Sequence, residues 1–296
     1  MRSTALLAFL SLSLLGAGGF AAAVTPLAEP VDAVRKLVRA GDTEAAVEAG
    51  DKAIETRADD AHAWLWAARA YGRQAQEASM LMKPKWAGRA REAWEKAIEL
   101  DAGLIDARLD LIEYYLLAPG FLGGGRDKAD AQAAAIANLD QAFGKLAAAR
   151  LASADKDYPR AETLLREGLT IAPDNNRVRQ ALAGLLQTQT RWADVRALWN
   201  EVLQRRPDDA FALYQIGRAA ALSGEDLDNG LASIDRFIAN AVIPEDLSMG
   251  AAHWRRGQIL AKLGRADEAI AAMQIATHDA AIRAQAEADL KKLRKG

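Results

Sequence analysis

Few side chains in this sequence could carry out chemistry, and none stands at the spacing that an active site requires. The chain has no cysteine, which excludes thiolate catalysis and Cys-ligated zinc. Its three histidines, His62, His253 and His278, have no His or Asp partner at metal-ligand spacing. Residues 123–125 are glycines that precede a predicted helix but follow no strand, so a nucleotide-binding loop is not indicated. We therefore expect a protein that is not an enzyme and that has no cofactor and no metal site.

The composition predicts an all-α fold. Hydrophobic residues make up 51% of the 296 residues and aromatic residues only 6%, so the apolar content is mainly alanine and leucine. Both residues enter helices at little cost, and alanine lets two helices approach closely. The formal net charge of −2 provides no general attraction to phosphates. Nucleic acid is therefore not an expected partner.

The N-terminus has the three parts of a secretory signal peptide. Arg2 supplies the positive charge, residues 5–15 form an apolar run with serines, and residues 21–23 are three alanines. We expect cleavage after Ala23 and a mature protein, residues 24–296, in a bacterial periplasm or otherwise exported. The alternative is a membrane anchor, but the run is shorter than the roughly 20 residues that span a bilayer.

A period of 34 residues organises the rest of the chain. The apolar stripe of Ala161, Leu165, Gly168 and Pro173 aligns without a gap with that of Val195, Trp199, Val202 and Pro207. An upstream stripe of Ala148, Ala149 and Ala152 aligns in the same way with Leu182, Ala183 and Leu186. Each stripe has helical spacing, and proline cannot continue a helix, so each unit is predicted to be a helix hairpin.

The segments WLWAARAY, AWEKAIELDA, LLREGLTIAPDN and KLGRADEAIAAM resemble the tetratricopeptide repeat family, and the resemblance covers residues 27 to about 278. The resemblance implies a right-handed superhelical α-solenoid of about seven helix-turn-helix repeats. Together with the predicted signal peptide, it indicates an exported bacterial member of the family. The repeats are expected at residues 27–60, 61–104, 105–141, 142–175, 176–209, 210–247 and 248–280. Residues 281–296 are expected to form a C-terminal capping helix with a polar outer face. Small residues such as Gly217 are expected where helices nearly touch.

The first of two insertions lies between the helices of the second repeat, at residues 72–88. Its exposed face would include Met80, Met82 and Trp86 beside lysines, which suits a loop that binds a partner or touches lipid. The alternative is that both helices extend by two turns, and that Met80, Leu81 and Trp86 fold back onto the solenoid.

The second insertion, residues 118–125, joins the helices of the third repeat. Its glycines permit unusual backbone conformations, and we expect Phe121 and Leu122 to anchor it. Because both insertions lie within hairpins of consecutive repeats, we expect them side by side, at one edge of the concave groove that stacked repeats would form. The sequence leaves open whether either insertion is functional or only structural.

The resemblance also implies a concave groove lined by the first helix of each repeat, at its second, fifth, ninth and twelfth positions. In this chain those positions hold Arg35, His62, Leu65, Arg69, Phe143, Leu146, Arg150, Arg177, Phe211, Tyr214, Arg218 and Trp254. Arginine and aromatic residues are enriched at protein-binding hot spots. The alternative is that each arginine pairs with Asp or Glu on the next helix. One family subtype binds a C-terminal carboxylate with Lys and Asn residues, but this chain lacks the matching asparagines.

These observations favour a periplasmic adaptor or scaffold that binds a protein or peptide partner in the groove. The alternative is an envelope-associated structural subunit that contacts a membrane or membrane complex through residues 72–88. The sequence does not identify the partner or the oligomeric state.

Overall fold

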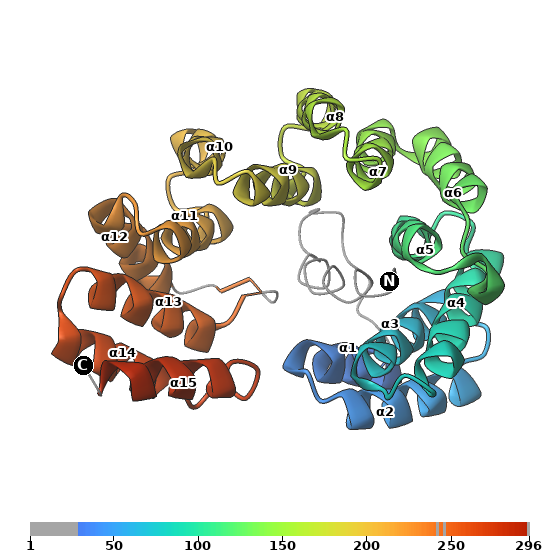
Figure 1. Ribbon diagram of the computed structural model, residues 1–296, viewed down its shortest axis with the longest axis horizontal. Helices are drawn as coiled ribbons and strands as arrows, with labels where there is room; N and C mark the ends of the chain where they lie inside the picture. Colours follow the sequence, from blue (N-terminus) through green and yellow to red (C-terminus); the bar gives the residue numbers. More distant parts are fainter. Residues whose placement is uncertain (1–28, 241–242, 245–246, 295–296) are drawn as a thin grey trace, which may run out of the picture. The chain divides into compact units, whose positions relative to one another are not determined.

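The computed structural model describes residues 29–240, 243–244 and 247–294, so the predicted signal peptide lies outside the described residues. Within them the chain is entirely helical and has no strand (Figure 1). The helices are α1 (Glu29–Ala40), α2 (Thr43–Thr56), α3 (Ala61–Glu77), α4 (Lys83–Leu100), α5 (Ile105–Leu117), α6 (Arg126–Leu139), α7 (Gln141–Ala154), α8 (Tyr158–Ile171), α9 (Asn176–Thr188), α10 (Trp192–Arg205), α11 (Ala210–Ser223), α12 (Leu227–Ala239), α13 (Met249–Lys262), α14 (Ala266–Ala276) and α15 (Arg283–Leu293). A 3₁₀ helix, η1 (Gly120–Leu122), lies between α5 and α6.

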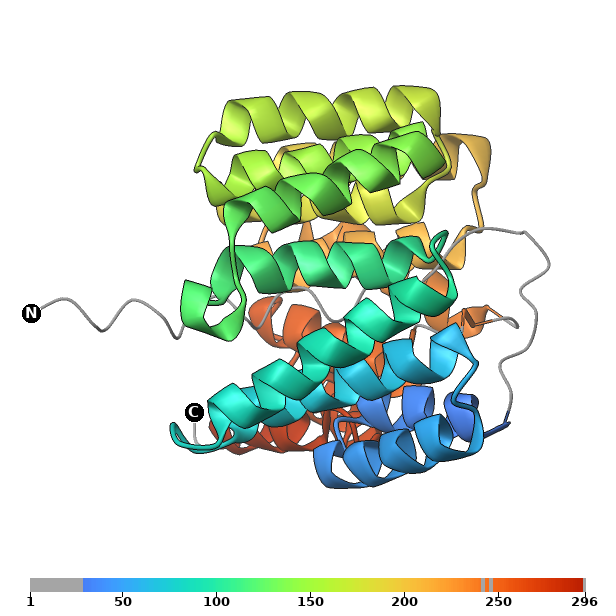
Figure 2. The same cartoon turned by 90° about the vertical axis from the view of Figure 1, so that its right-hand side faces the viewer.

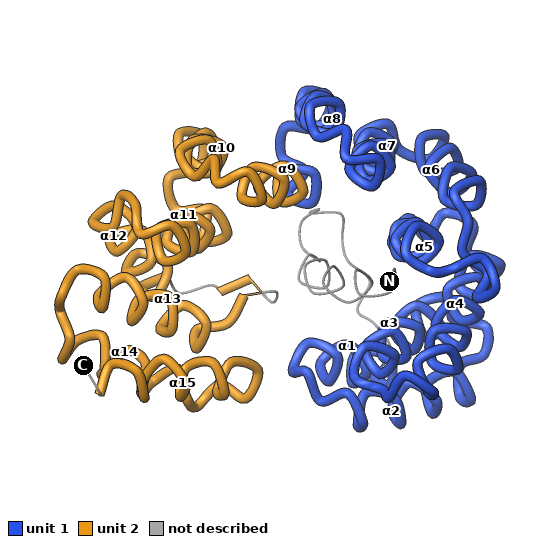
Figure 3. Tube along the Cα trace, in the orientation of Figure 1, with its two compact units in different colours: residues 1–15, 20–178 blue, residues 16–19, 179–296 orange. Residues whose placement is uncertain are grey.

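Consecutive helices form seven hairpins, from α1 with α2 to α13 with α14, and α15 follows the last hairpin. The predicted all-α fold of seven helix pairs and a C-terminal helix is confirmed. The chain forms two compact units, with the boundary between Val178 and Arg179 in α9 (Figure 3). Unit 1 contains α1 to α8, and unit 2 contains α10 to α15.

Six of the described helices begin at a side chain that caps the first turn. Asp42, Asp60, Asp140, Asp157, Asp209 and Ser248 each accept a hydrogen bond from a backbone N–H of the helix that follows. Such a cap satisfies one of the amides that a helix leaves without a partner at its start. At the other end of α11, Gly224 has φ of 78°, a left-handed conformation that favours glycine. These local signals fix where each hairpin turns.

Within each unit, several first helices of neighbouring pairs pack on one another. In unit 1, α1 contacts α3 and α5 contacts α7, while in unit 2 α13 lies between α11 and α15. Figure 1 shows α5 and α7 on one side of unit 1, and α6 and α8 on the other. We call the surface formed by α1, α3, α5 and α7 the first-helix face of unit 1, and the surface formed by α11 and α13 the first-helix face of unit 2; α9 contributes its first residues to unit 1 and the rest to unit 2.

Small residues allow the helices to approach. A Cβ atom on Gly217 in α11 would lie 2.9 Å from Cδ1 of Ile234 in α12. A Cβ atom on Gly257 in α13 would lie 2.6 Å from Cγ of Met273 in α14. Because packed interiors leave no room for such overlap, both hairpins require glycine at these positions.

The first insertion shows both predicted behaviours in different residues. The helices do extend, since α3 continues to Glu77 and α4 begins at Lys83. The Trp86 ring packs 6.1 Å from the ring of Tyr71. The tip, however, is exposed: Met80, Leu81 and Met82 have 74%, 91% and 41% of their surface accessible. Only the tryptophan folds back.

The second insertion is held differently from the prediction. Phe121 is 84% exposed, so the expectation that it anchors the loop is wrong. The anchor is instead a hydrogen bond from the Tyr114 hydroxyl to the Leu122 carbonyl, at 2.7 Å. Gly124 also lies so close to Ala118 that a Cβ atom would be 1.8 Å from its carbonyl oxygen. Figure 2 shows both insertions at the same end of their hairpins in unit 1.

No helix among the described residues combines the length and the apolar character needed to cross a membrane.

Candidate partner-binding surface

In unit 1, the most buried arginine of the first-helix face is Arg69, which is only 7% exposed. Its Nε donates a hydrogen bond to Asp110 of α5 at 2.7 Å, and its Nη2 lies 3.6 Å from Asp106. The guanidinium also stacks on Trp66, 4.7 Å from the ring centroid. Arg69 therefore joins α3 to α5 and does not offer its charge to a partner.

Two further arginines reach α5 from later helices. Arg177 of α9 forms an ion pair with Asp106 and lies over the ring of Phe143 at 5.4 Å. Arg150 of α7 donates a hydrogen bond to the Leu109 carbonyl at 2.9 Å. Three of the predicted groove arginines, Arg69, Arg150 and Arg177, thus converge on one helix, and two of them meet carboxylates there.

The carboxylates Asp106 and Asp110 were not among the predicted site residues. Asp106 occupies the second position of the first helix in the third repeat, which is a groove position, so extending the repeat frame could have found it. Asp110 lies one turn further along the same helix. Arg69 and Arg177 do pair with carboxylates, but on α5 rather than on the next helix along the chain, where the alternative placed the partners.

Several other predicted residues take part in internal packing. Arg35 forms an ion pair with Asp32 of its own helix. Phe143, Phe211 and Tyr214 are buried, and Leu65 and Leu146 are core residues as well. In unit 2, Phe211 packs on Trp199 and Tyr214 on Phe237, each pair with ring centroids 5.4 Å apart. His62 is exposed at the start of α3.

Unit 2 presents two arginines in a different environment. Arg218 of α11 makes one long hydrogen bond, 3.4 Å, to the side-chain oxygen of Gln187 in α9. Burial, and next the positive charge of Arg255, lowers the pKa of Arg218. Arg255 of α13 lies over the ring of Trp254 at 4.1 Å and donates to Gln258 at 2.7 Å. Its Nε is buried and has no hydrogen-bond partner among the described residues.

The C-terminal helix holds this part of α13 in place. Asp289 of α15 accepts hydrogen bonds from the Trp254 indole at 3.0 Å and from Gln258 at 2.9 Å. Burial raises the pKa of Asp289, but the hydrogen bonds from Gln258, Lys292 and Trp254 outweigh that effect, so the pKa lies below its ordinary value. Trp254, predicted to contact a partner, thus uses its N–H internally and keeps only its ring for other contacts.

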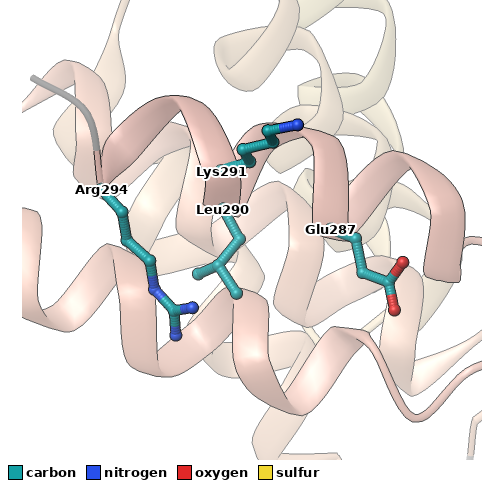
Figure 4. A pocket seen from close by; sticks show the side chains of 4 residues that line it. All are labelled: Glu287, Leu290, Lys291 and Arg294. Atoms are coloured by element: carbon teal, nitrogen blue, oxygen red, sulfur yellow. The ribbon is translucent and has the colours of Figure 1, made fainter.

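No group of three His, Asp or Glu side chains in the described part of the chain could hold a metal ion. A depression at the C-terminus is lined by Glu287, Leu290 and Lys291 of α15 and by Arg294, which directly follows that helix (Figure 4). Burial lowers the pKa of His253, and the positive charge of Arg256 acts in the same direction. Neither feature provides a nucleophile beside a base.

The fold is that of the tetratricopeptide-repeat proteins, a class of helical-hairpin scaffolds. The structure of yeast Tom70 is 15% identical and matches with a TM-score of 0.55 over 84% of this chain and 53% of that chain, so this chain spans about half of it. A tetratricopeptide repeat protein from Parabacteroides merdae is 14% identical, with a TM-score of 0.48 over 90% of this chain and 98% of the other. No family model and no curated protein sequence matches the chain.

Proposed function

We propose that this protein is an exported adaptor that binds a segment of a partner protein on its first-helix face. The observation that carries the proposal is the contrast between the arginines of that face. In unit 1, Arg69 and Arg177 are paired with carboxylates, whereas Arg218 and Arg255 in unit 2 are hydrogen-bonded only to glutamines among the described residues. Two cations held beside one another without an anion suit a binding surface better than a stabilising contact.

The chemistry of the face agrees with this function. Arginine and aromatic residues supply most hot-spot energy in protein interfaces, and Arg150, Arg218 and the ring of Trp254 are only partly buried. Stacked helix pairs also create an extended surface without any catalytic group. We propose no catalysis.

Affinity capture from the cell envelope with the mature protein tests this function. The test variant is Arg150→Glu, because Arg150 is a partly exposed arginine of the first-helix face. The matched control is Arg166→Glu on the second helix α8, where Arg166 is exposed and pairs only with Glu162 of its own helix. We expect Arg150→Glu to lose captured partner and the control to retain it. Equal capture by both variants, with unchanged helical content, would reject the first-helix face.

A second function is favoured by the exposed tip of the first insertion. Met80 and Leu81 are 74% and 91% exposed and lie next to Lys83 and Lys85, a combination that suits contact with an anionic membrane surface. The double change Met80→Asp with Leu81→Asp should abolish sedimentation with vesicles that contain anionic lipid. Trp86 is unsuitable for this test because it packs on Tyr71. If the parent does not sediment with such vesicles, this second function is rejected.

Export is the remaining part of the proposal, and it rests on the sequence of residues 1–23. N-terminal sequencing of the protein from fractionated cells should find a chain that begins near Val24 outside the cytoplasm. An intact Met1 in the cytosolic fraction would contradict export.

A further inference from the structure

We propose that Arg218 and Arg255 form a binding site for a side-chain carboxylate of an acidic partner segment, which deepens the proposed function and rests on it. The two arginines come from α11 and α13, the first helices of successive pairs, which pack directly on one another. The site lies wholly within unit 2.

In the part of the chain that the structure describes, no paired carboxylate balances the charges of these two arginines. The nearby carboxylate Asp289 is occupied by Trp254, Gln258 and Lys292. Among the described residues, no carboxylate forms an ion pair with Arg218 or Arg255 within 4 Å. Partly buried like charges repel, and burial removes part of their hydration. An anion at this place would relieve both effects.

Asp235, a second carboxylate that contacts α13, also already has a partner. It accepts a hydrogen bond from Arg256 at 2.6 Å. Arg256 and Arg255 are neighbours in sequence but face different surroundings, because Arg255 bonds to Gln258 instead. Asp289 and Asp235 are therefore both engaged by residues other than Arg218 and Arg255.

Both arginines have donors to offer. A guanidinium carries five N–H donors, and within the described part of the chain the side chain of Arg218 makes one hydrogen bond, the long one to Gln187. Arg255 donates one N–H to Gln258, and its buried Nε has no partner among the described residues. An arginine can donate to a carboxylate through two parallel N–H groups, and the Nη groups of both arginines supply such donors.

Arg255 is held ready for such a contact before any partner arrives. Gln258 accepts from Arg255 and donates to Asp289, so α15 fixes the orientation of the side chain through one intermediate residue. The Trp254 ring beneath the guanidinium limits its movement further. A side chain that is already ordered loses less entropy on binding, which increases affinity.

The net charge of the chain argues for an isolated carboxylate rather than a polyanion. With a formal net charge of −2, the protein as a whole does not attract nucleic acid. Two planar guanidiniums match the flat, two-oxygen geometry of a carboxylate. An acidic side chain in a partner segment provides that group at a fixed position.

The test uses two capped pentapeptides, acetyl-Ser-Glu-Ser-Glu-Ser-amide and its counterpart with Gln in place of Glu, together with inorganic phosphate. Binding to the full mature protein is followed by NMR of the arginine Nε–H groups and by calorimetry. We expect the Glu peptide to shift the Arg255 Nε–H resonance and the Gln peptide to leave it unchanged. Arg218→Gln and Arg255→Gln should each weaken binding about tenfold or more, since each removes hydrogen bonds between charged groups. The control, Arg265→Gln, removes an exposed arginine paired with Glu268 and should bind like the parent.

Two results would overturn the site: equal binding of the Glu and Gln peptides, or unchanged binding in both site variants. Tighter binding of inorganic phosphate than of the Glu peptide would overturn the assignment to a carboxylate. The proposed function is judged separately. The peptide-binding tests can fail while Arg150→Glu still loses the captured partner and Arg166→Glu retains it. In that case the adaptor function stands and only the carboxylate site is rejected.

Discussion

Arg69 and Arg218 occupy the same ninth position of their repeats, yet replacing each by glutamine should change the free energy of unfolding by very different amounts. Arg69→Gln leaves Asp110, whose side chain is 18% exposed, without the cation that donates to it at 2.7 Å. Breaking a fully buried pair costs roughly 3–5 kcal/mol, and the residual exposure of Asp110 reduces that figure. We therefore expect a loss of about 2–3 kcal/mol in the free energy of unfolding.

Arg218→Gln removes only a 3.4 Å hydrogen bond and relieves the repulsion from Arg255. The two effects oppose each other, so the change in unfolding free energy should stay within about 1 kcal/mol of zero. Urea unfolding followed by circular dichroism measures both variants, with unit-specific transitions fitted separately because repeat arrays need not unfold in one step. A double change, Arg69→Met with Asp110→Leu, should recover at least half of the loss. Equal destabilisation by Arg69→Gln and Arg218→Gln would refute the reasoning.

Two further predictions concern unit 2. Gly217→Leu should destabilise it by a few kcal/mol, because even a Cβ atom would lie 2.9 Å from Ile234; a melting curve that matches the parent's would contradict this close approach. Asp289 has a lowered pKa, so its stabilising contribution is complete above the ordinary carboxyl pKa and is lost as pH falls through the lower folded pKa. We expect the fluorescence of Trp254 to change as the pH falls through that acid range. The Asp289→Asn variant should not show this fluorescence change, and an unchanged transition in the variant would assign it to another group.

The helix hairpins could be predicted from sequence because their signals are local. The 34-residue period, the apolar stripes and the prolines that end helices all lie within one repeat, and caps such as Asp140 and Asp209 confirm the same boundaries. The same repeat frame predicts that two helices approach closely at Gly217, and α11 and α12 do so there.

The roles of the arginines could not be predicted in the same way. Arg69 donates to Asp110, which lies 41 residues away on a helix of a different hairpin. Arg218 instead experiences the positive charge of Arg255. Position within the repeat is identical, so only the residues of the next first helix decide between a structural and a binding role. The first insertion was equally hard to predict from sequence, because Trp86 packs on Tyr71 whereas Leu81, a few residues away, is exposed.

Site-specific photo-crosslinking tests the central claim most directly. A photoreactive phenylalanine derivative is placed on first helices at His62 and Gln180, and on second helices at the exposed residues Glu99 and Glu201. After irradiation in intact cells, we predict partner adducts from positions 62 and 180 and none from positions 99 and 201. Adducts from the second-helix positions alone would contradict binding on the first-helix face.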